Sequence, residues 1–198
     1  MPRVRANDYD AKASTIMDAA AALFARDGYP AVKMQDIAKE CGATKSMLYH
    51  YYATKDELLA AMLEDHLSEL LEVMEQAALH KGTPDECMLA FVTAYTQRSS
   101  DSRRRHMVAM NDVKYLPADV QAPLVDMQRK MTDLAATFLG KVHPNLAKKL
   151  YKPYAMLLLG MLNWIDVWFR AEGPVKPKEL RDRITHLFLH GFLSVDTK

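Results

Sequence analysis

The amino-acid sequence predicts an all-α protein of about nine helices, in which a small N-terminal head of three helices precedes a larger helical body. Apolar residues recur every three or four positions along most of the chain, and no segment shows the strict alternation of a β-strand. Capping residues precede several of these segments, and glycine or proline follows several of them. Apolar residues make up 49% of the 198 residues, which is enough for a sizeable core.

The head is predicted to contain a helix-turn-helix. Its first helix has apolar residues at helical spacing and ends at Gly28. A second helix is expected over about 34–41 and a third over 45–51, with Thr44 as the N-cap of the third. Gly42 lies between these two helices and can adopt the positive φ that a tight turn needs. Two short helices joined by such a turn are a helix-turn-helix candidate.

Six more helices are predicted in the body, residues 54–198, which follows a head of residues 1–53. The fourth helix begins at the capping box from Thr54 to Glu57 and continues for about twenty residues. The fifth has Pro84 at its first helical position. The last four are expected at about 103–114, 123–139 (closed by Gly140), 146–170 and 177–193.

Charge and glycine spacing exclude several functional classes. The net charge of +1, from 26 Lys and Arg against 25 Asp and Glu, excludes wholesale binding of polyanions. No two of the seven glycines lie closer than 13 residues, whereas Rossmann, Walker and nucleophile-elbow motifs need closely spaced glycines. His186 and His190 have the spacing of metal ligands, but no third ligand is evident. We therefore expect no enzymatic activity, no metal and no cofactor.

The sequence predicts a cytoplasmic protein that does not associate with membranes. Two cysteines are too few for a disulfide framework, and the first residues lack the apolar core of a signal peptide. The most apolar stretch, residues 154–169, is interrupted by Asn163 and Asp166. It is also shorter than the roughly 20 residues that a membrane span requires.

The stretch from Ala31 to Leu59 resembles the DNA-binding signature of TetR-family transcriptional regulators. The matching positions are Ile37-Ala38, Gly42, Leu48-Tyr49-His50, Tyr52, Lys55 and Leu58-Leu59, with Ala20, Phe24 and Gly28-Tyr29 upstream. The resemblance implies a ligand-responsive repressor that binds a palindromic, double-stranded DNA operator as a homodimer. In such a head, the helix over 45–51 enters the major groove while flanking groups hold phosphates.

Four residues are expected to hold the DNA backbone. By the resemblance, Thr44, Tyr49 and Lys55 contact phosphates, which sets affinity and register and not sequence choice. Lys33 stands where the family usually has a Ser or Thr that caps the second helix. A lysine cannot cap in that way, but its charge can meet a phosphate.

Sequence choice is expected to come from Lys45, Met47 and His50, which are the base-side candidates of the recognition helix. Met47 replaces a small hydroxyl residue that is usual in the family, and its side chain favours apolar contact with a thymine methyl group. Ser46 replaces a common glycine, so the backbone there approaches DNA less closely. Leu48 and Tyr52 are expected to pack inside the head.

The C-terminal part is similar to TetR regulators that control fatty-acid or aromatic-acid breakdown, through residues 160–170, Gly173-Pro174 and 187–192. This resemblance implies a small hydrophobic effector, for which an acyl-CoA thioester is the expected example. It also implies that the last two helices form a four-helix bundle across the homodimer. Met and aromatic residues suit an adaptable pocket. The ligand-binding candidates are Met107, Met110, Asn111, Asn163, Trp164 and Trp168.

Several alternatives stay open at this point. The same fold can serve as a ligand-independent DNA-binding or protein-adaptor module, and promoter geometry decides between repression and activation. Asn163 and Asp166 can touch a ligand or pair across the dimer. Arg103, Arg104 and Arg105 can meet the phosphates of a CoA moiety, although a solvated face is the usual role of a charge run.

Overall fold

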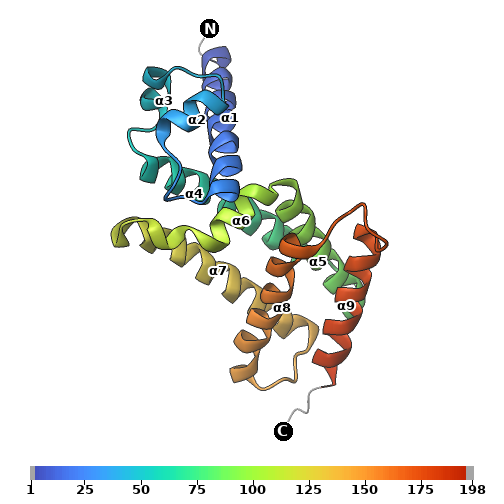
Figure 1. Ribbon diagram of the computed structural model, residues 1–198. Helices are drawn as coiled ribbons and strands as arrows, with labels where there is room; N and C mark the ends of the chain where they lie inside the picture. Colours follow the sequence, from blue (N-terminus) through green and yellow to red (C-terminus); the bar gives the residue numbers. More distant parts are fainter. Residues whose placement is uncertain (1–2, 195–198) are drawn as a thin grey trace. The chain divides into compact units, whose positions relative to one another are not determined.

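The computed structural model describes the backbone of residues 3–194 and the side chains of residues 9–194. Within this part of the chain, nine α-helices and one short 3₁₀ helix are present and no strand (Figure 1). The all-α prediction is therefore confirmed. The elements are α1 (Arg3–Asp27), α2 (Met34–Glu40), α3 (Lys45–Tyr51), α4 (Lys55–Ala77), α5 (Pro84–Asp101), α6 (Arg103–Asn111), η1 (Val113–Tyr115), α7 (Ala118–Val142), α8 (Lys148–Trp168) and α9 (Pro177–Leu193).

Two of the body helices differ from the prediction. The segment 103–114 is not one helix, because α6 ends at Asn111 and η1 follows it. The next helix, α7, begins at Ala118 and not at Pro123, since the carbonyl of Pro117 already accepts bonds from two backbone N–H groups that follow it. Gly140 does not end α7. It lies within the helix, where it packs against the ring of Tyr151.

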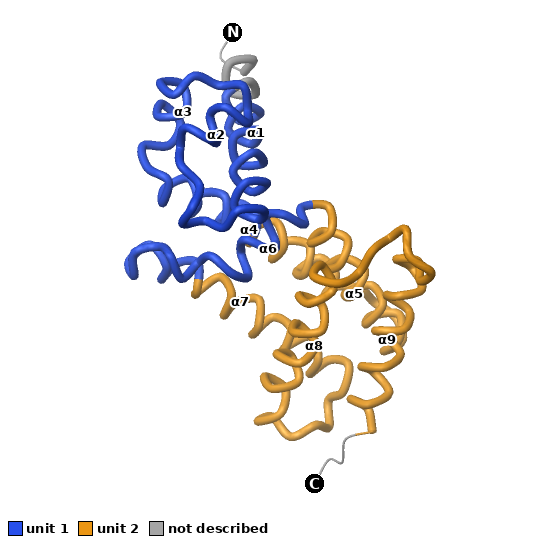
Figure 2. The backbone as a smooth tube through the Cα atoms, viewed as in Figure 1, with its two compact units in different colours: residues 1–66, 102–124 blue, residues 67–101, 125–198 orange. Residues whose placement is uncertain are grey.

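The chain forms two compact units, which Figure 2 shows in different colours. Unit 1 comprises Met1–His66 and Ser102–Leu124, and unit 2 comprises Leu67–Asp101 and Val125–Lys198. Unit 1 therefore holds the helix-turn-helix together with α6, η1 and the first part of α7. This division differs from the expected boundary after residue 53, because α6 packs closely against α1.

The core of unit 1 holds the short helices α2 and α3 in place. Ile37 of α2 and Leu48 of α3 are fully buried, as are Ala20 and Phe24 of α1, and Tyr52 is nearly so. The expected packing roles of Leu48 and Tyr52 are confirmed. Gly28 ends α1 and Gly42 lies in the α2–α3 turn. Both adopt positive φ, of 81° and 65°, which is a conformation that favours glycine.

In unit 2, α5 packs against both α8 and α9. The buried rings of Phe91 and Phe138 stack with their centroids 4.5 Å apart, and Leu158, Leu162 and Leu189 are fully buried in the same unit. Apolar burial of this kind is the main favourable term in the stability of the unit. None of the described helices is both long enough and apolar enough to cross a membrane.

Candidate nucleic-acid interface and effector site

The recognition helix α3 is fixed by its first residue and by its buried face. Thr44 caps it as predicted, since its Oγ1 accepts a hydrogen bond from the N–H of Met47 at 3.1 Å. With Leu48 turned into the core, the side chains of Lys45, Tyr49 and His50 are exposed and that of Met47 is half-buried. The Lys45 ammonium lies 5.7 Å from the centroid of the Tyr49 ring. This face of α3 therefore presents hydrogen-bond donors and one apolar side chain to the outside.

The start of α2 carries a further exposed cation. The Lys33 side chain makes no capping bond, as expected for lysine, and the Asp36 carboxylate instead accepts a bond from the Lys33 backbone N–H at 2.9 Å. The side chain of Lys33 thus stays exposed and available to a phosphate.

Lys55 is held differently from the other predicted DNA contacts. Its ammonium donates to the carbonyls of Tyr29 and Val32, both at 2.8 Å, and lies 4.2 Å from the centroid of the Tyr29 ring. Burial lowers the pKa of Lys55, while the charge of Asp56 opposes that shift. An ammonium has three protons, so these two bonds leave one proton to meet a phosphate. The sequence predicted the positive charge of Lys55 at this position, but it did not predict the two hydrogen bonds to backbone carbonyls.

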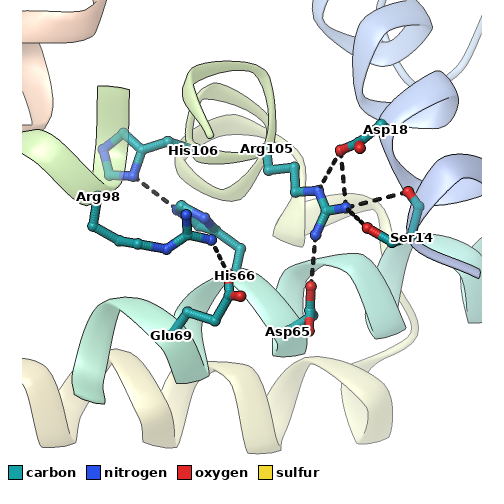
Figure 3. A network of polar contacts seen from close by, with 8 residues as sticks. All are labelled: Ser14, Asp18, Asp65, His66, Glu69, Arg98, Arg105 and His106. Carbon is teal, nitrogen blue, oxygen red and sulfur yellow. Dashed lines mark hydrogen bonds and ion pairs between the residues drawn. The ribbon is translucent and has the colours of Figure 1, made fainter. Parts of the chain in front are cut away.

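Arg105 is neither solvated nor exposed to a ligand, which corrects the expectation for a charge run. The residue is 6% exposed. Figure 3 shows it donating from Nε to Asp18 at 2.9 Å, from Nη1 to Asp65 at 2.6 Å, and from Nη2 to the side chain and carbonyl of Ser14. The fork of an arginine can meet two carboxylates at once. Arg105 therefore joins α6 to α1 and α4 within unit 1, whereas Arg104 is exposed.

A buried histidine pair accompanies this network and was not singled out from the sequence. His66 of α4 and His106 of α6 are fully buried, and His66 Nε2 lies 3.1 Å from His106 Nδ1 (Figure 3). One ring must donate and the other accept, so the two tautomers are coupled. The only signal in the sequence was the position of His66 within the apolar stripe of α4.

A second group of buried polar residues lies inside unit 2. The Tyr95 hydroxyl donates to the Asn163 side-chain oxygen, and Asp166 lies on the same helix as Asn163 and is buried. Burial raises the pKa of Tyr95, and the charge of Asp166 raises it further. Thr185 of α9 is also buried, at 5% exposure. Polar groups in such surroundings need partners, and the Tyr95 hydroxyl and the Asn163 side chain are partners of each other.

The two tryptophans do not share the surroundings of Asn163. Trp164 and Trp168 are 64% and 54% exposed and line an open apolar groove of about 630 Å³ between α8 and α9, together with Leu157, Ile184 and Leu187.

The three candidates on α6 belong to unit 1. Met110 and Asn111 are exposed and Met107 is half-buried, and the Asn111 amide donates to the Met107 carbonyl at 2.7 Å. The six ligand-binding candidates thus divide between the two units, three on α6 and three on α8.

No metal centre is apparent within the residues whose side chains the structure describes. The rings of His186 and His190 lie with their centroids 4.1 Å apart on α9. No group of three or more His, Cys, Asp or Glu side chains gathers there or elsewhere among these residues.

Two family models match the chain. One, described as bacterial regulatory proteins of the tetR family, matches residues 16–62, which contain the helix-turn-helix. The other, described as the tetracyclin repressor-like C-terminal domain, matches residues 81–192, more than half of the chain.

Known proteins match over very different lengths. Two curated relatives align over only 80 and 65 residues, so that the chain spans 39% and 34% of their length. The HTH-type transcriptional repressor KstR2 of Rhodococcus jostii is 23% identical over 189 residues, covering 90% of each chain.

Solved structures match over nearly the whole chain. A TetR-family transcriptional regulator from Bordetella parapertussis is 35% identical, with a TM-score of 0.84 over 93% of this chain and 97% of that one. AibR, in complex with isovaleryl coenzyme A and operator DNA, has a TM-score of 0.76 at 21% identity, covering 92% and 98% of the two chains. The identity to AibR shows a shared fold alone. The matches to both family models and to the Bordetella regulator show that this chain belongs to the TetR family of transcriptional regulators, which are DNA-binding transcription factors and not enzymes.

Proposed function

We propose that the protein is a ligand-responsive transcriptional repressor that acts in the cytoplasm and binds a palindromic, double-stranded DNA operator as a homodimer. The observation that carries this proposal is the outer face of α3. That helix is capped by Thr44, anchored by Leu48, and presents Lys45, Tyr49 and His50 to the outside. A second recognition helix, from the other subunit, reads the second half-site about one helical turn of DNA away.

The proposed contacts divide by chemistry. Lys33, Thr44, Tyr49 and Lys55 hold phosphates, because each offers an N–H or O–H donor at an edge of α2, α3 or α4. The candidates for base edges are Lys45, Met47 and His50, which lie on α3 itself. Lysine suits the acceptors of guanine, and the Met47 side chain suits a thymine methyl group.

We propose that the apolar face of α8 and α9 is the dimer interface. Trp164, Trp168 and Leu187 are among its exposed large side chains, at 54–69% exposure. Exposed apolar patches of this kind mark interaction surfaces. Pairing of α8 and α9 with the same two helices of a second copy gives a four-helix bundle and the two-fold symmetry that a palindrome requires.

The proposed effector is a small hydrophobic molecule, with an acyl-CoA thioester as the specific candidate. Three observations support an effector of this kind. A buried polar group around Tyr95 and Asn163 lies between α5 and α8 of unit 2, the fold is shared with AibR, whose structure contains isovaleryl coenzyme A, and a relative that matches over 90% of each chain is the repressor KstR2. The candidate contacts remain Met107, Met110, Asn111 and Asn163, with Trp164 and Trp168 also on the proposed dimer face.

In this proposal the effector releases the repressor from DNA by shifting the population of molecules from the DNA-bound to the DNA-free conformation. An effector changes operator affinity only to the extent that it binds the DNA-free conformation more tightly than the DNA-bound one. Ligand contacts on α6 act on unit 1 directly, since α6 belongs to that unit.

The effector proposal is tested by native mass spectrometry of the purified protein with a panel of CoA thioesters of increasing chain length. We expect a dimer that retains one thioester per subunit and loses its operator in the same concentration range. Asn163→Ala should weaken retention, whereas Asn145→Ala, a change at an exposed turn position, should not. A dimer that binds operator but ignores every thioester and every free fatty acid would instead identify a ligand-independent DNA-binding module.

A further inference from the structure

The short segment after α6 packs on the DNA-binding head through one aromatic residue. Tyr115, the last residue of η1, stacks on Tyr29 with ring centroids 5.6 Å apart and an interplanar angle of 20°. Asp112 precedes it, is 8% exposed, and lies close enough for its charge to raise the pKa of Tyr29. Asp112 and Tyr115 both fall within residues 54–198, the body that the sequence predicts. The structure places them in unit 1 with the helix-turn-helix.

Tyr29 in turn holds the start of α4. Its backbone carbonyl accepts a hydrogen bond from the Lys55 ammonium at 2.8 Å, and its ring lies 4.2 Å from the same ammonium. Its hydroxyl donates to the Asp56 carboxylate. Tyr29 thus contacts the first two residues of α4 through three different groups, and it is itself 5% exposed.

The chain of contacts runs from Tyr115 through Tyr29 to Lys55. Tyr115 is 43% exposed, so its ring lies between part of the Tyr29 ring and solvent. Removing the Tyr115 ring removes this stacking contact from the Tyr29 ring, which keeps its contact with Phe24 and its hydrogen bond to Asp56. A cation held over an aromatic face depends on the placement of that face.

We propose that Tyr115, which lies outside the helix-turn-helix, is a positioning residue for DNA binding that acts through Tyr29 on the phosphate contact of Lys55. The inference rests on the proposed function, in which Lys55 meets a phosphate. It assigns to η1 a part in DNA affinity without any contact between η1 and DNA.

The salt dependence of binding separates this role from a merely structural one. Each phosphate neutralised by a cation contributes about 0.9 to the slope of log K against log salt concentration. In a variant that is only less stable, the molecules that are folded still bind with the salt slope of the wild-type protein. A variant in which Lys55 no longer reaches its phosphate loses about one phosphate contact from the slope.

The experiment measures binding by fluorescence anisotropy at several salt concentrations, with a duplex that the wild-type protein has selected from a randomised pool. The variants are Tyr115→Ala, Lys55→Met and the double substitution. The conservative variant Tyr115→Phe is the matched control because it keeps the ring. We expect Lys55→Met to weaken binding about tenfold, the loss of one charge-assisted hydrogen bond, and to lower the slope by about 0.9.

Tyr115→Ala should reproduce the lowered slope. In the Lys55→Met background it should weaken binding by less than about a further twofold, because the two changes act on one contact. Tyr115→Phe should behave as wild type.

An unchanged slope in Tyr115→Ala, or full additivity with Lys55→Met, overturns the proposal. So does an unchanged slope in Lys55→Met. If Tyr115→Ala does not fold, Tyr115→Leu keeps the apolar bulk without the ring and replaces it. Failure of the wild-type protein to select any duplex would instead contradict the proposed function itself.

Discussion

At the scale of single residues, the polar groups of the head show which interactions the sequence can reveal. Thr44 and the box from Thr54 to Glu57 were predictable, because a capping hydroxyl and its partner N–H lie three residues apart. Arg105 was not, since the carboxylates of Asp18 and Asp65 lie 87 and 40 positions away in the chain. Pairing over such separations depends on the tertiary fold.

Arg105 should therefore matter to stability in a way that its neighbour does not. Arg105→Met keeps the apolar stem but removes the bonds to Asp18, Asp65 and Ser14. We expect it to lower the free energy of unfolding by about 1.5–3 kcal/mol, the range for hydrogen bonds to charged groups, with the loss limited because both carboxylates stay partly solvated. Urea denaturation followed by circular dichroism measures the change.

Arg104→Met is the matched control for this measurement. Arg104 is exposed on the same helix, and surface substitutions of this kind usually change the unfolding free energy by less than about 0.5 kcal/mol. Equal unfolding free energies for the two variants would show that the Arg105 network does not hold unit 1 together.

At the scale of elements, helix existence was predictable and some boundaries were not. The periodicity of apolar residues located nine helices, and strong caps placed the starts of α3, α4 and α5 correctly. The predicted start of α7 at Pro123 is wrong, because the Pro117 carbonyl already accepts the first bonds of the helix. The predicted end at Gly140 is also wrong, since a glycine is found as well where a neighbouring ring packs closely. Local sequence does not distinguish these two uses.

The exposed face of α8 and α9 makes a prediction about assembly. Leu187→Asp places a charge at the centre of the proposed dimer face and should convert the dimer to monomer, because an unpaired charge in an apolar interface is costly. Sedimentation velocity measures the result. Leu79→Asp is the control, since Leu79 is 67% exposed, against 69% for Leu187, and does not line the α8–α9 groove. A Leu187→Asp protein that sediments as wild type would place the dimer interface elsewhere.

At the scale of the whole molecule, the chain forms two compact units, one of which holds the helix-turn-helix. The sequence predicted a head that ends at residue 53, just before the capping box at Thr54, and residues 102–124 pack with the helix-turn-helix in the same unit. Contacts between segments far apart in the chain, among them Arg105 to Asp18 and Tyr115 to Tyr29, produce this arrangement.

The candidate DNA-binding site, like the fold, was predictable from the sequence only in part. The recognition helix and its exposed residues followed from the spacing of Gly42, Thr44 and Leu48. The engagement of Lys55 by two carbonyls could not be predicted, because it requires the turn after α1 to lie against the start of α4. The hydrogen bond between Tyr95 and Asn163 likewise depends on the packing of α5 on α8.

The central claim is that α3 reads a specific DNA sequence, and selection from a randomised duplex pool tests it most directly. The wild-type protein at moderate salt should enrich a palindrome whose half-sites are centred about one helical turn apart, or a multiple of that distance. Met47→Ala should alter the preferred base at one position of each half-site, whereas Tyr49→Phe should weaken binding to all sequences similarly. If the wild-type protein enriches no sequence, the claim that α3 reads an operator is contradicted; if only Met47→Ala leaves the selected sequence unchanged, the base contact assigned to Met47 is contradicted.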